Sequence, residues 1–333
     1  MLTQKKFAGL VTMFLAGMVT IFMIAPVASA QEFKPPVTRN AALRYWIAFS
    51  LMQDPPADLK TSTLLNMMAQ GKTEWDEAKL GPTVDANRDA ILTMQRATRL
   101  PECDWGLEYH LGPETPLPPY AKARVLGNLN LMYGMRQAAH HDMAGAVETW
   151  LAGVRFAEHF AQGESLLGVM IGTSMLQPNM KALDAAVLRG ELDEKSRREV
   201  AKAIRVSPEY GFDWSESWRF ETYGTIVAIK QIKDSPDPKQ RYSEIFGEFP
   251  PAPFVPPTAE DLRKFQMVMD EITAAFRLPY LEAKERLAAI APRIATMNPM
   301  IAAMVPNASR ANDARGEVQA ARQKLLEDLA KGS

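Results

Sequence analysis

The chain has 333 residues, of which 23% are charged and 47% hydrophobic, and its formal net charge is -1 at pH 7. A near-neutral chain without a long basic run has no long-range attraction for nucleic acid, which excludes nucleic-acid binding as its main function. The single cysteine, Cys103, excludes an intramolecular disulfide, and its acidic neighbours Glu102 and Asp104 disfavour a reactive thiolate.

The first thirty residues have the pattern of an export signal. Two lysines precede the apolar run Phe7–Ile24, and small residues at Ala28 and Ala30 mark a cleavage site. We therefore predict that residues 1–30 are a signal peptide and that the mature chain begins at Gln31. The location expected for such a chain is periplasmic or secreted.

An uncleaved anchor is the alternative for this leader, because eighteen apolar residues are almost enough to cross a bilayer. Without residues 1–30 the chain keeps 36 basic and 39 acidic residues, a net charge of about -3. The most apolar later stretch, Leu166–Leu176, is too short to span a membrane and reads as a buried helix. No membrane span is therefore expected in the mature chain.

Three helices are predicted in the first part of the mature chain: Asn40–Met52, Leu59–Met68 and Asp85–Thr98. In the first of them, Leu43, Trp46, Ile47 and Leu51 are spaced to share one face. The stretch from Leu100 to Pro119 holds five prolines and is predicted to be an irregular connector or a functional loop.

From Tyr120 to Lys233 the pattern is almost continuously helical, with brief polar or glycine-bearing breaks. Short connections between amphipathic helices predict antiparallel hairpins stacked side by side. The segment Ser165–Leu188 begins apolar on all sides, which is typical of a central, covered helix. The predicted fold class is therefore all-α.

A Pro-rich segment, 235–257, has seven prolines in 23 residues and is predicted to be an extended linker. It divides a helical hairpin domain, 31–234, from a C-terminal helical region, 258–333. In that region Thr258 and Asp261 have the spacing of a capping box, Pro279 interrupts the helical pattern, and Asn312–Ala330 forms a last helix.

Two resemblances bear on the hairpins. Gly134, Ala146, Trp150 and Gly153 have the spacing that tetratricopeptide-type hairpins use for close helix contact and one aromatic wedge. This likeness covers one repeat, and the 34-residue period does not continue, so the predicted array is irregular.

The mature chain also resembles a family of exported, all-helical bacterial proteins that has no assigned activity. The residues that carry this likeness are Asn40-Ala41-Ala42, Tyr45-Trp46 and Cys103-Asp104-Trp105-Gly106. The resemblance implies a helical hairpin fold.

Two groups of residues could be metal sites, but in both a structural role is favoured. We expect no metal and no cofactor. The first group is His140, His141 and His159. His140 and His141 are adjacent, so on a helix their side chains point in different directions and cannot bind one metal ion together. We expect both at a helix end, with Asp142 capping the next helix. Met297, Met300 and Met304 could share a face and bind copper(I), but methionine is also the usual filler of irregular cores.

Glu221 is the one candidate catalytic residue. It is in line with Trp214 and Trp218 on a predicted helix, where partial burial would raise its pKa and suit it to general acid catalysis of glycoside cleavage. A second carboxylate is missing, since Glu216 is off that face and can pair with Arg219. A structural, hydrogen-bonded glutamate is the alternative.

Glu164-Ser165 and Met175-Leu176-Gln177-Pro178 look like a fragment of the lytic transglycosylase motif. The spacing is too short and the internal Gly-Ala-x-Gly is missing, so this family is rejected.

The function predicted from the sequence is an exported helical scaffold or binding module for a protein or peptide partner. The alternative is a hydrolase of envelope glycan or peptide that uses Glu221.

Overall fold

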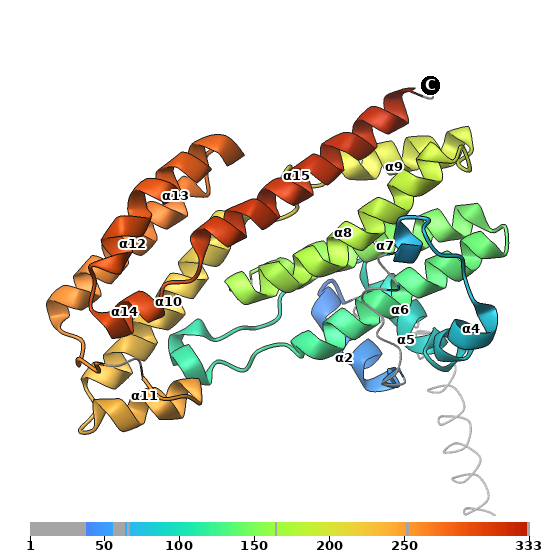
Figure 1. Ribbon diagram of the computed structural model, residues 1–333. Coiled ribbons are helices and arrows are strands. Elements are labelled where there is room, and N and C mark those ends of the chain that lie inside the picture. The colour runs from blue at the N-terminus through green and yellow to red at the C-terminus, as the bar shows by residue number, and fades with distance from the viewer. Residues whose placement is uncertain (1–37, 56–63, 65–66, 164, 251–252, 332–333) are drawn as a thin grey trace, which may run out of the picture. The chain divides into compact units, whose positions relative to one another are not determined.

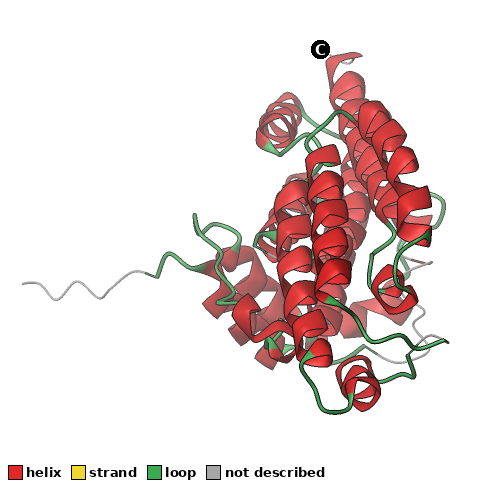
Figure 2. Cartoon of the chain, turned by 90° about the vertical axis from the view of Figure 1, so that its left-hand side faces the viewer, coloured by secondary structure: helices red, strands yellow, loops and turns green. Residues whose placement is uncertain are grey.

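A computed structural model describes residues 38–55, 64, 67–163, 165–250 and 253–331. Within these residues it contains helices and loops but no strand, which confirms the all-α class (Figure 2). Residues 39–333 form one compact unit. Its helices, in chain order, are α2 (Ala41–Leu51), α4 (Glu77–Ala86), α5 (Arg88–Ala97), the 3-10 helix η1 (Tyr109–Glu114), α6 (Tyr120–Ala139), α7 (Met143–Ala161), α8 (Leu166–Leu188), α9 (Glu194–Val206), α10 (Trp214–Lys233), α11 (Pro238–Phe246), α12 (Ala259–Ala275), α13 (Tyr280–Ala295), α14 (Pro299–Ala303) and α15 (Ala308–Lys331).

Helices α6, α7 and α8 pack against one another at the centre of this unit (Figure 1). Trp150 of α7 is buried against Gly134 of α6, where an added Cβ would lie 2.4 Å from the indole Nε1. Gly153 makes an equally close contact with Asn179 of α8. The small and aromatic residues noted in the sequence therefore do bring these helices close, although a tetratricopeptide-like array stays a prediction.

The C-terminal helix α15 lies along α8 and also contacts α9 and α13 (Figure 1). Val318, Leu325 and Leu329 supply its buried apolar side chains. Gln177 of α8 donates to Glu317 over 3.2 Å, and Arg197 of α9 donates to the Leu329 carbonyl over 2.8 Å. The thin apolar stripe of this helix is therefore enough to pack it onto the hairpins.

The Pro-rich segment corrects one expectation, because part of 235–257 is helical. Pro238 occupies the first position of α11. A backbone N–H at this position has no partner inside the helix, so its absence in proline costs no hydrogen bond, and the fixed φ of proline suits a helix. Asp237 caps this helix through the Gln240 N–H, and Gly247 ends it in a left-handed conformation at φ 69°. A proline disfavours a helix chiefly in its interior, and α11 has no proline after its first position. The division of the chain into domains stays a prediction.

One helix was not expected, and two predicted segments cannot be compared. Helix α4 was not predicted and holds Pro82, yet Asp76 caps it and Leu80 and Val84 are buried in the core. Its Glu77 and Asp85 both pair with Arg136 of α6. The predicted helix Leu59–Met68 and the leader 1–30 fall mostly or wholly outside the described residues. The Leu100–Pro119 stretch is irregular apart from η1, and it packs on α10, where the Tyr109 and Phe220 rings stack 4.5 Å apart.

The two sequence motifs around Asn40 and Cys103 meet in space. The Asn40 side chain accepts from the Asp104 N–H at 2.9 Å and donates to the Asp104 carbonyl at 2.8 Å. The Tyr45 ring stacks on Trp105, with centroids 5.7 Å apart. These residues therefore fasten the start of α2 to the loop that follows α5.

Candidate functional site

Glu221 is partly buried on α10, and its carboxylate accepts a hydrogen bond from the backbone N–H of Leu166. Leu166 opens α8, and the Ser165 side chain before it makes no capping bond. The first N–H groups of a helix have no partner inside it, and the helix dipole favours an anion there. Burial nonetheless raises the pKa of Glu221, with the hydrogen bond acting in the opposite direction.

The aromatic side chains expected beside Glu221 pack elsewhere. Trp214 and Trp218 are buried against Phe276, with ring centroids 6.1 and 5.1 Å from it. The carboxylate of Glu221 instead meets the start of α8. This position fits the structural interpretation of Glu221 better than that of an acid on an aromatic, sugar-binding stripe.

A cavity of about 260 Å³ lies one helical turn from Glu221, between the end of α7 and the start of α10. Three carboxylates line it: Glu158, Asp213 and Glu216. Asp213 is occupied as the cap of α10, where it accepts from the Glu216 N–H at 3.0 Å. Glu158 is the one acid of this cavity that the sequence analysis did not associate with α10.

Glu158 reaches this cavity from α7 and is partly buried. Burial raises its pKa, opposed by a hydrogen bond from the Ser207 hydroxyl and by the charge of Arg155. The bond ties α7 to the connection between α9 and α10. The sequence analysis missed Glu158. It could have been found because it is an acid within the otherwise apolar stretch of α7.

His159 also borders this cavity, but its ring is held by the aromatic core. Its Nδ1 lies 2.8 Å from the Tyr45 hydroxyl oxygen, and its carbonyl accepts from the Trp105 indole N–H at 3.1 Å. Burial lowers the pKa of His159 to about 4, aided by the charge of Arg155. The imidazole is therefore neutral at pH 7 and serves as a buried polar contact.

His140 and His141, the other two members of the histidine group, lie at the end of α6. His140 is its C-cap, with Nε2 3.5 Å from Glu77, and His141 adopts a left-handed φ of 65°. Asp142 caps α7 through the Gly145 N–H, as expected. Across the residues that the structure describes, no group of three or more His, Cys, Asp or Glu side chains could hold a metal ion.

The remaining residues singled out by the sequence have structural surroundings. Met300 is buried in the core and Met297 and Met304 are partly buried against it. Cys103 is also buried. Gln177, part of the rejected transglycosylase fragment, bonds to α15, while Glu164 lies outside the described residues.

A larger cavity, of about 520 Å³, lies where the ends of α6 and α8 meet the start of α7 and the segment before α4. Its apolar lining is Met68, Met135, Met143, Trp75, Ala138 and Ala139. The polar lining includes Glu74 and the pair Arg189 and Glu191, joined by two hydrogen bonds of 2.7 and 2.8 Å. The sequence places Met135 on the apolar face of its helix, but it does not show that Met68, Met135 and Met143 meet, because they lie on three separate segments.

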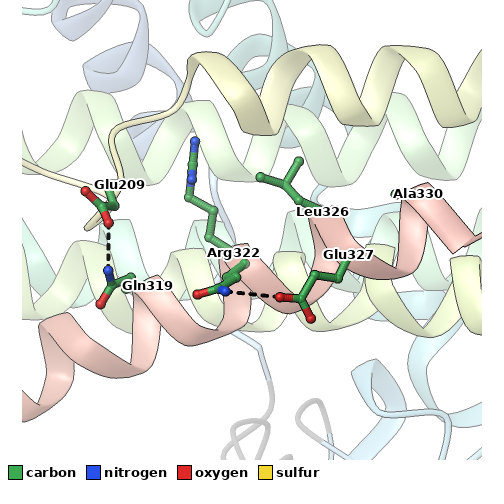
Figure 3. Close-up of a pocket in the computed structure, with 7 residues that line it drawn as sticks. Glu209, Gln319, Arg322, Leu326, Glu327 and Ala330 are labelled. Atoms are coloured by element: carbon green, nitrogen blue, oxygen red, sulfur yellow. Dashed lines mark hydrogen bonds between the residues drawn. The ribbon is translucent and has the colours of Figure 1, made fainter.

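An open groove of about 450 Å³ follows the outer side of α15 (Figure 3). Gln319 donates to Glu209 over 2.6 Å across one end of it. The Arg322 guanidinium donates to the carbonyls of Ile204 and Arg205, at 3.1 and 3.3 Å. These hydrogen bonds hold α15 against the end of α9 and the segment that follows it. We therefore interpret the groove as the edge of a helix–helix contact.

The outer face of α2 is the clearest apolar surface. Leu43, Trp46, Ile47 and Leu51 share one face, as predicted, and are 59%, 47%, 53% and 45% exposed. The packed face of the helix is made by other residues instead: Ala41, Ala42, Tyr45, Ala48 and Phe49. We call the four exposed side chains the outer α2 face.

Comparison with known proteins adds no relative, since no family model, curated protein or solved structure matches this chain. No helix in the described part of the chain is long and apolar enough to cross a membrane. The function therefore has to be argued from the sites themselves.

Proposed function

We propose that this chain is an exported helical binding module for a peptide segment of a protein partner. The observation that carries this proposal is the 520 Å³ cavity with its methionine wall, here called the methionine cavity. Its volume is within the range of about 300–1,000 Å³ common for ligand sites, and such sites join apolar walls to a few polar groups.

The chemistry of the methionine cavity suits a peptide. Thioether side chains are unbranched and polarisable, so Met135 and Met143 can adjust to apolar side chains of different shapes. The Arg189 and Glu191 pair, with Glu74, offers donors and acceptors for a peptide backbone. An apolar side chain would enter against the methionines while its backbone meets the polar groups.

Export is the second part of this proposal. It rests on the leader pattern of residues 1–30, which ends in Ala28-Ser29-Ala30. Mass spectrometry of the chain recovered from the cell envelope tests it directly. A first residue at Gln31 supports a cleaved leader, and recovery only from the cytoplasm contradicts export.

The alternative proposal, hydrolysis of envelope glycan or peptide, has one observation in its favour. Burial raises the pKa of both Glu221 and Glu158, as a general acid requires. Both carboxylates already have a structural partner, in the Leu166 N–H and the Ser207 hydroxyl. This is why we favour the binding module.

Photocrosslinking from the methionine cavity tests the proposed function. A benzophenone side chain at Ala139, which lines the cavity and is exposed, should capture one protein at near-equal amount in the intact envelope. The same probe at Met267, an exposed residue of α12, is the positional control. Capture from both positions alike, or from neither, contradicts a specific site.

A matched pair of variants completes the test. Met135→Glu places a charge in the methionine cavity and should weaken binding of the captured partner's peptide, measured by calorimetry, by about tenfold or more. Met267→Glu changes the same residue type on an exposed surface and should leave that affinity unchanged. Equal affinities for both variants would place the binding site elsewhere.

A further inference from the structure

The charged groups that line the methionine cavity do not balance. They are Glu74, Arg189 and Glu191. Arg189 donates through Nε and Nη2 to the two carboxylate oxygens of Glu191, at 2.7 and 2.8 Å, so these two charges neutralise each other. Glu74 has neither an ion pair nor a hydrogen bond with any residue that the structure describes. The lining therefore carries one uncompensated negative charge.

Cations of the neighbouring segments do not supply the missing charge. Arg136 of α6 pairs with Glu77 and Asp85, at 2.5 and 2.6 Å. Lys72 precedes Glu74 by two positions in the sequence, but it is not part of the cavity lining. A cation brought by a ligand would therefore find the carboxylate of Glu74 available.

The residue next to Glu74 also favours a cation. Trp75 lines the cavity, and its indole N–H donates to Glu77 over 2.6 Å. Glu77 is in turn held by Arg136, so the indole has a fixed partner at the wall of the cavity. The π face of an indole is negative and attracts an ammonium or guanidinium group that reaches it. Glu74 and Trp75 thus make one side of the cavity suited to a positive charge.

The cavity has room for a cation beside an apolar side chain. Its volume of about 520 Å³ is that of a site for a whole small ligand. In an extended peptide, residues two positions apart share a face, so both could enter from the same side. The long stem of a lysine can lie along the thioethers while its ammonium group stays near water. Glu74 is exposed, which meets that requirement.

We propose that the peptide bound in the methionine cavity carries a lysine or arginine two positions from its apolar side chain, and that this cation pairs with Glu74. The proposal rests on the proposed function and names the class of peptide that the site selects. An acidic residue at that position is disfavoured, because it would bring two like charges together. An apolar residue there would leave Glu74 without a partner.

Short peptides test the proposal on the full chain, labelled with ¹³C at its methionine methyl groups. The first peptide is acetyl-Ala-Leu-Ala-Lys-Ala-amide. The second has norleucine in place of lysine, which keeps the apolar stem and lacks the ammonium group. A second pair has the leucine and the basic position exchanged, because a peptide can run in either direction. The methyl resonance of Met135, identified by its loss in Met135→Leu, reports binding in the cavity.

In at least one of the two orders, the lysine peptide should bind about fivefold more tightly than its norleucine counterpart at low salt. Glu74→Gln keeps the size of the side chain and removes its charge, so it should reduce this ratio to about one. Glu282→Gln, at an exposed glutamate of α13, is the matched control and should keep the wild-type ratio. Circular dichroism checks that each variant is folded.

The outcomes separate this proposal from the proposed function. Norleucine peptides that shift the Met135 resonance and bind as tightly as the lysine peptides in both orders would overturn the proposal and support the peptide site. A preference for lysine that persists in Glu74→Gln would also overturn it. If none of the peptides shifts the Met135 resonance at about 10 mM, the peptide site is refuted and this proposal with it.

Discussion

The guanidinium carbon of Arg315 lies 4.2 Å from the centroid of the Tyr210 ring, inside the protein. Its two terminal nitrogens donate to the carbonyls of Phe276 and Leu278, at 2.6 and 2.8 Å. These carbonyls follow α12, where the helix dipole is negative and favours a cation. One side chain of α15 thus joins α12 to the connection between α9 and α10.

Replacement of Arg315 should strongly destabilise the fold. Arg315→Ala removes the contact with Tyr210 and leaves two buried carbonyls without donors, so we expect a loss of about 3 kcal/mol of unfolding free energy. Urea denaturation measures it. Arg263→Ala, on the exposed surface of α12, is the control and should change stability by less than about 0.5 kcal/mol. An equal loss of unfolding free energy in Arg315→Ala and Arg263→Ala would refute the proposed role of Arg315 in stability.

Two glycines of helices should respond to alanine with opposite signs. At Gly134 an added methyl group would lie 2.4 Å from the Trp150 Nε1, and we expect Gly134→Ala to destabilise by about 1–3 kcal/mol. At Gly224 on α10 no atom beyond its chain neighbours and the nearby backbone of the same helix lies within 4 Å of the added carbon, so Gly224→Ala should stabilise by about 0.5–1 kcal/mol. Thermal unfolding of both variants decides this, and a shared sign would contradict the close helix contact.

The neutral state of His159 should make the protein sensitive to acid. Its pKa is lowered to about 4 in the folded state, against about 6.5 when unfolded. Stability from this group is present above about pH 6.5 and is lost as the pH falls towards 4, by up to about 3 kcal/mol. Urea denaturation of the wild type and of His159→Gln at pH 7 and at pH 4 measures this contribution, as the change in their difference in unfolding free energy between the two pH values. A difference that does not vary with pH would be inconsistent with the burial of this ring.

Glu221→Gln separates the two proposed functions. The amide oxygen can still accept from the Leu166 N–H, so peptide binding should persist. The folded-state pKa of Glu221 is raised, so its contribution to stability is present below about pH 4.3 and lost as the pH rises through the shifted value. The variant should therefore gain stability relative to wild type between pH 4 and pH 8.

The same variant tests the hydrolase proposal. Wild-type turnover of cell-wall fragments that is lost in Glu221→Gln, while the fragments still bind, would favour the enzyme over the binding module. Arg263→Ala serves as the control for purification and folding in that assay. We expect no turnover of cell-wall fragments by the wild type or by Glu221→Gln.

Much of the fold can be predicted from the sequence because helical periodicity is a local property. The four residues of the outer α2 face were correctly assigned to one side of a helix. Periodicity does not say which side packs. The side that packs against α5 combines the alanines with the buried rings of Tyr45 and Phe49. The same limit explains α4, which buries only the short apolar pair Leu80 and Val84 and is capped by Asp76, so its sequence has little periodicity to detect.

The sites were harder to predict, since they join residues far apart in the chain. Met68, Met135 and Met143 form one wall only after three segments have packed. Glu221 was found through its neighbours on α10, but its actual partner, Leu166, is 55 positions earlier. Glu158 could have been found locally, as an acid within an apolar helix.

The packing of α15 has a consequence for the order of events during biosynthesis. Its contacts with α8 and α9 join residues more than 100 positions apart, as in the bonds between Lys324 and Asp184 and between Arg322 and Ile204. Pairings of such long sequence separation form late, because the intervening chain must first be ordered. Until the last two dozen residues have been synthesised, the sides of α8 and α9 that α15 covers have no cover. Packing of α15 is therefore expected to be the step that completes the fold, and under the proposed export it would follow the passage of the C-terminal end across the membrane.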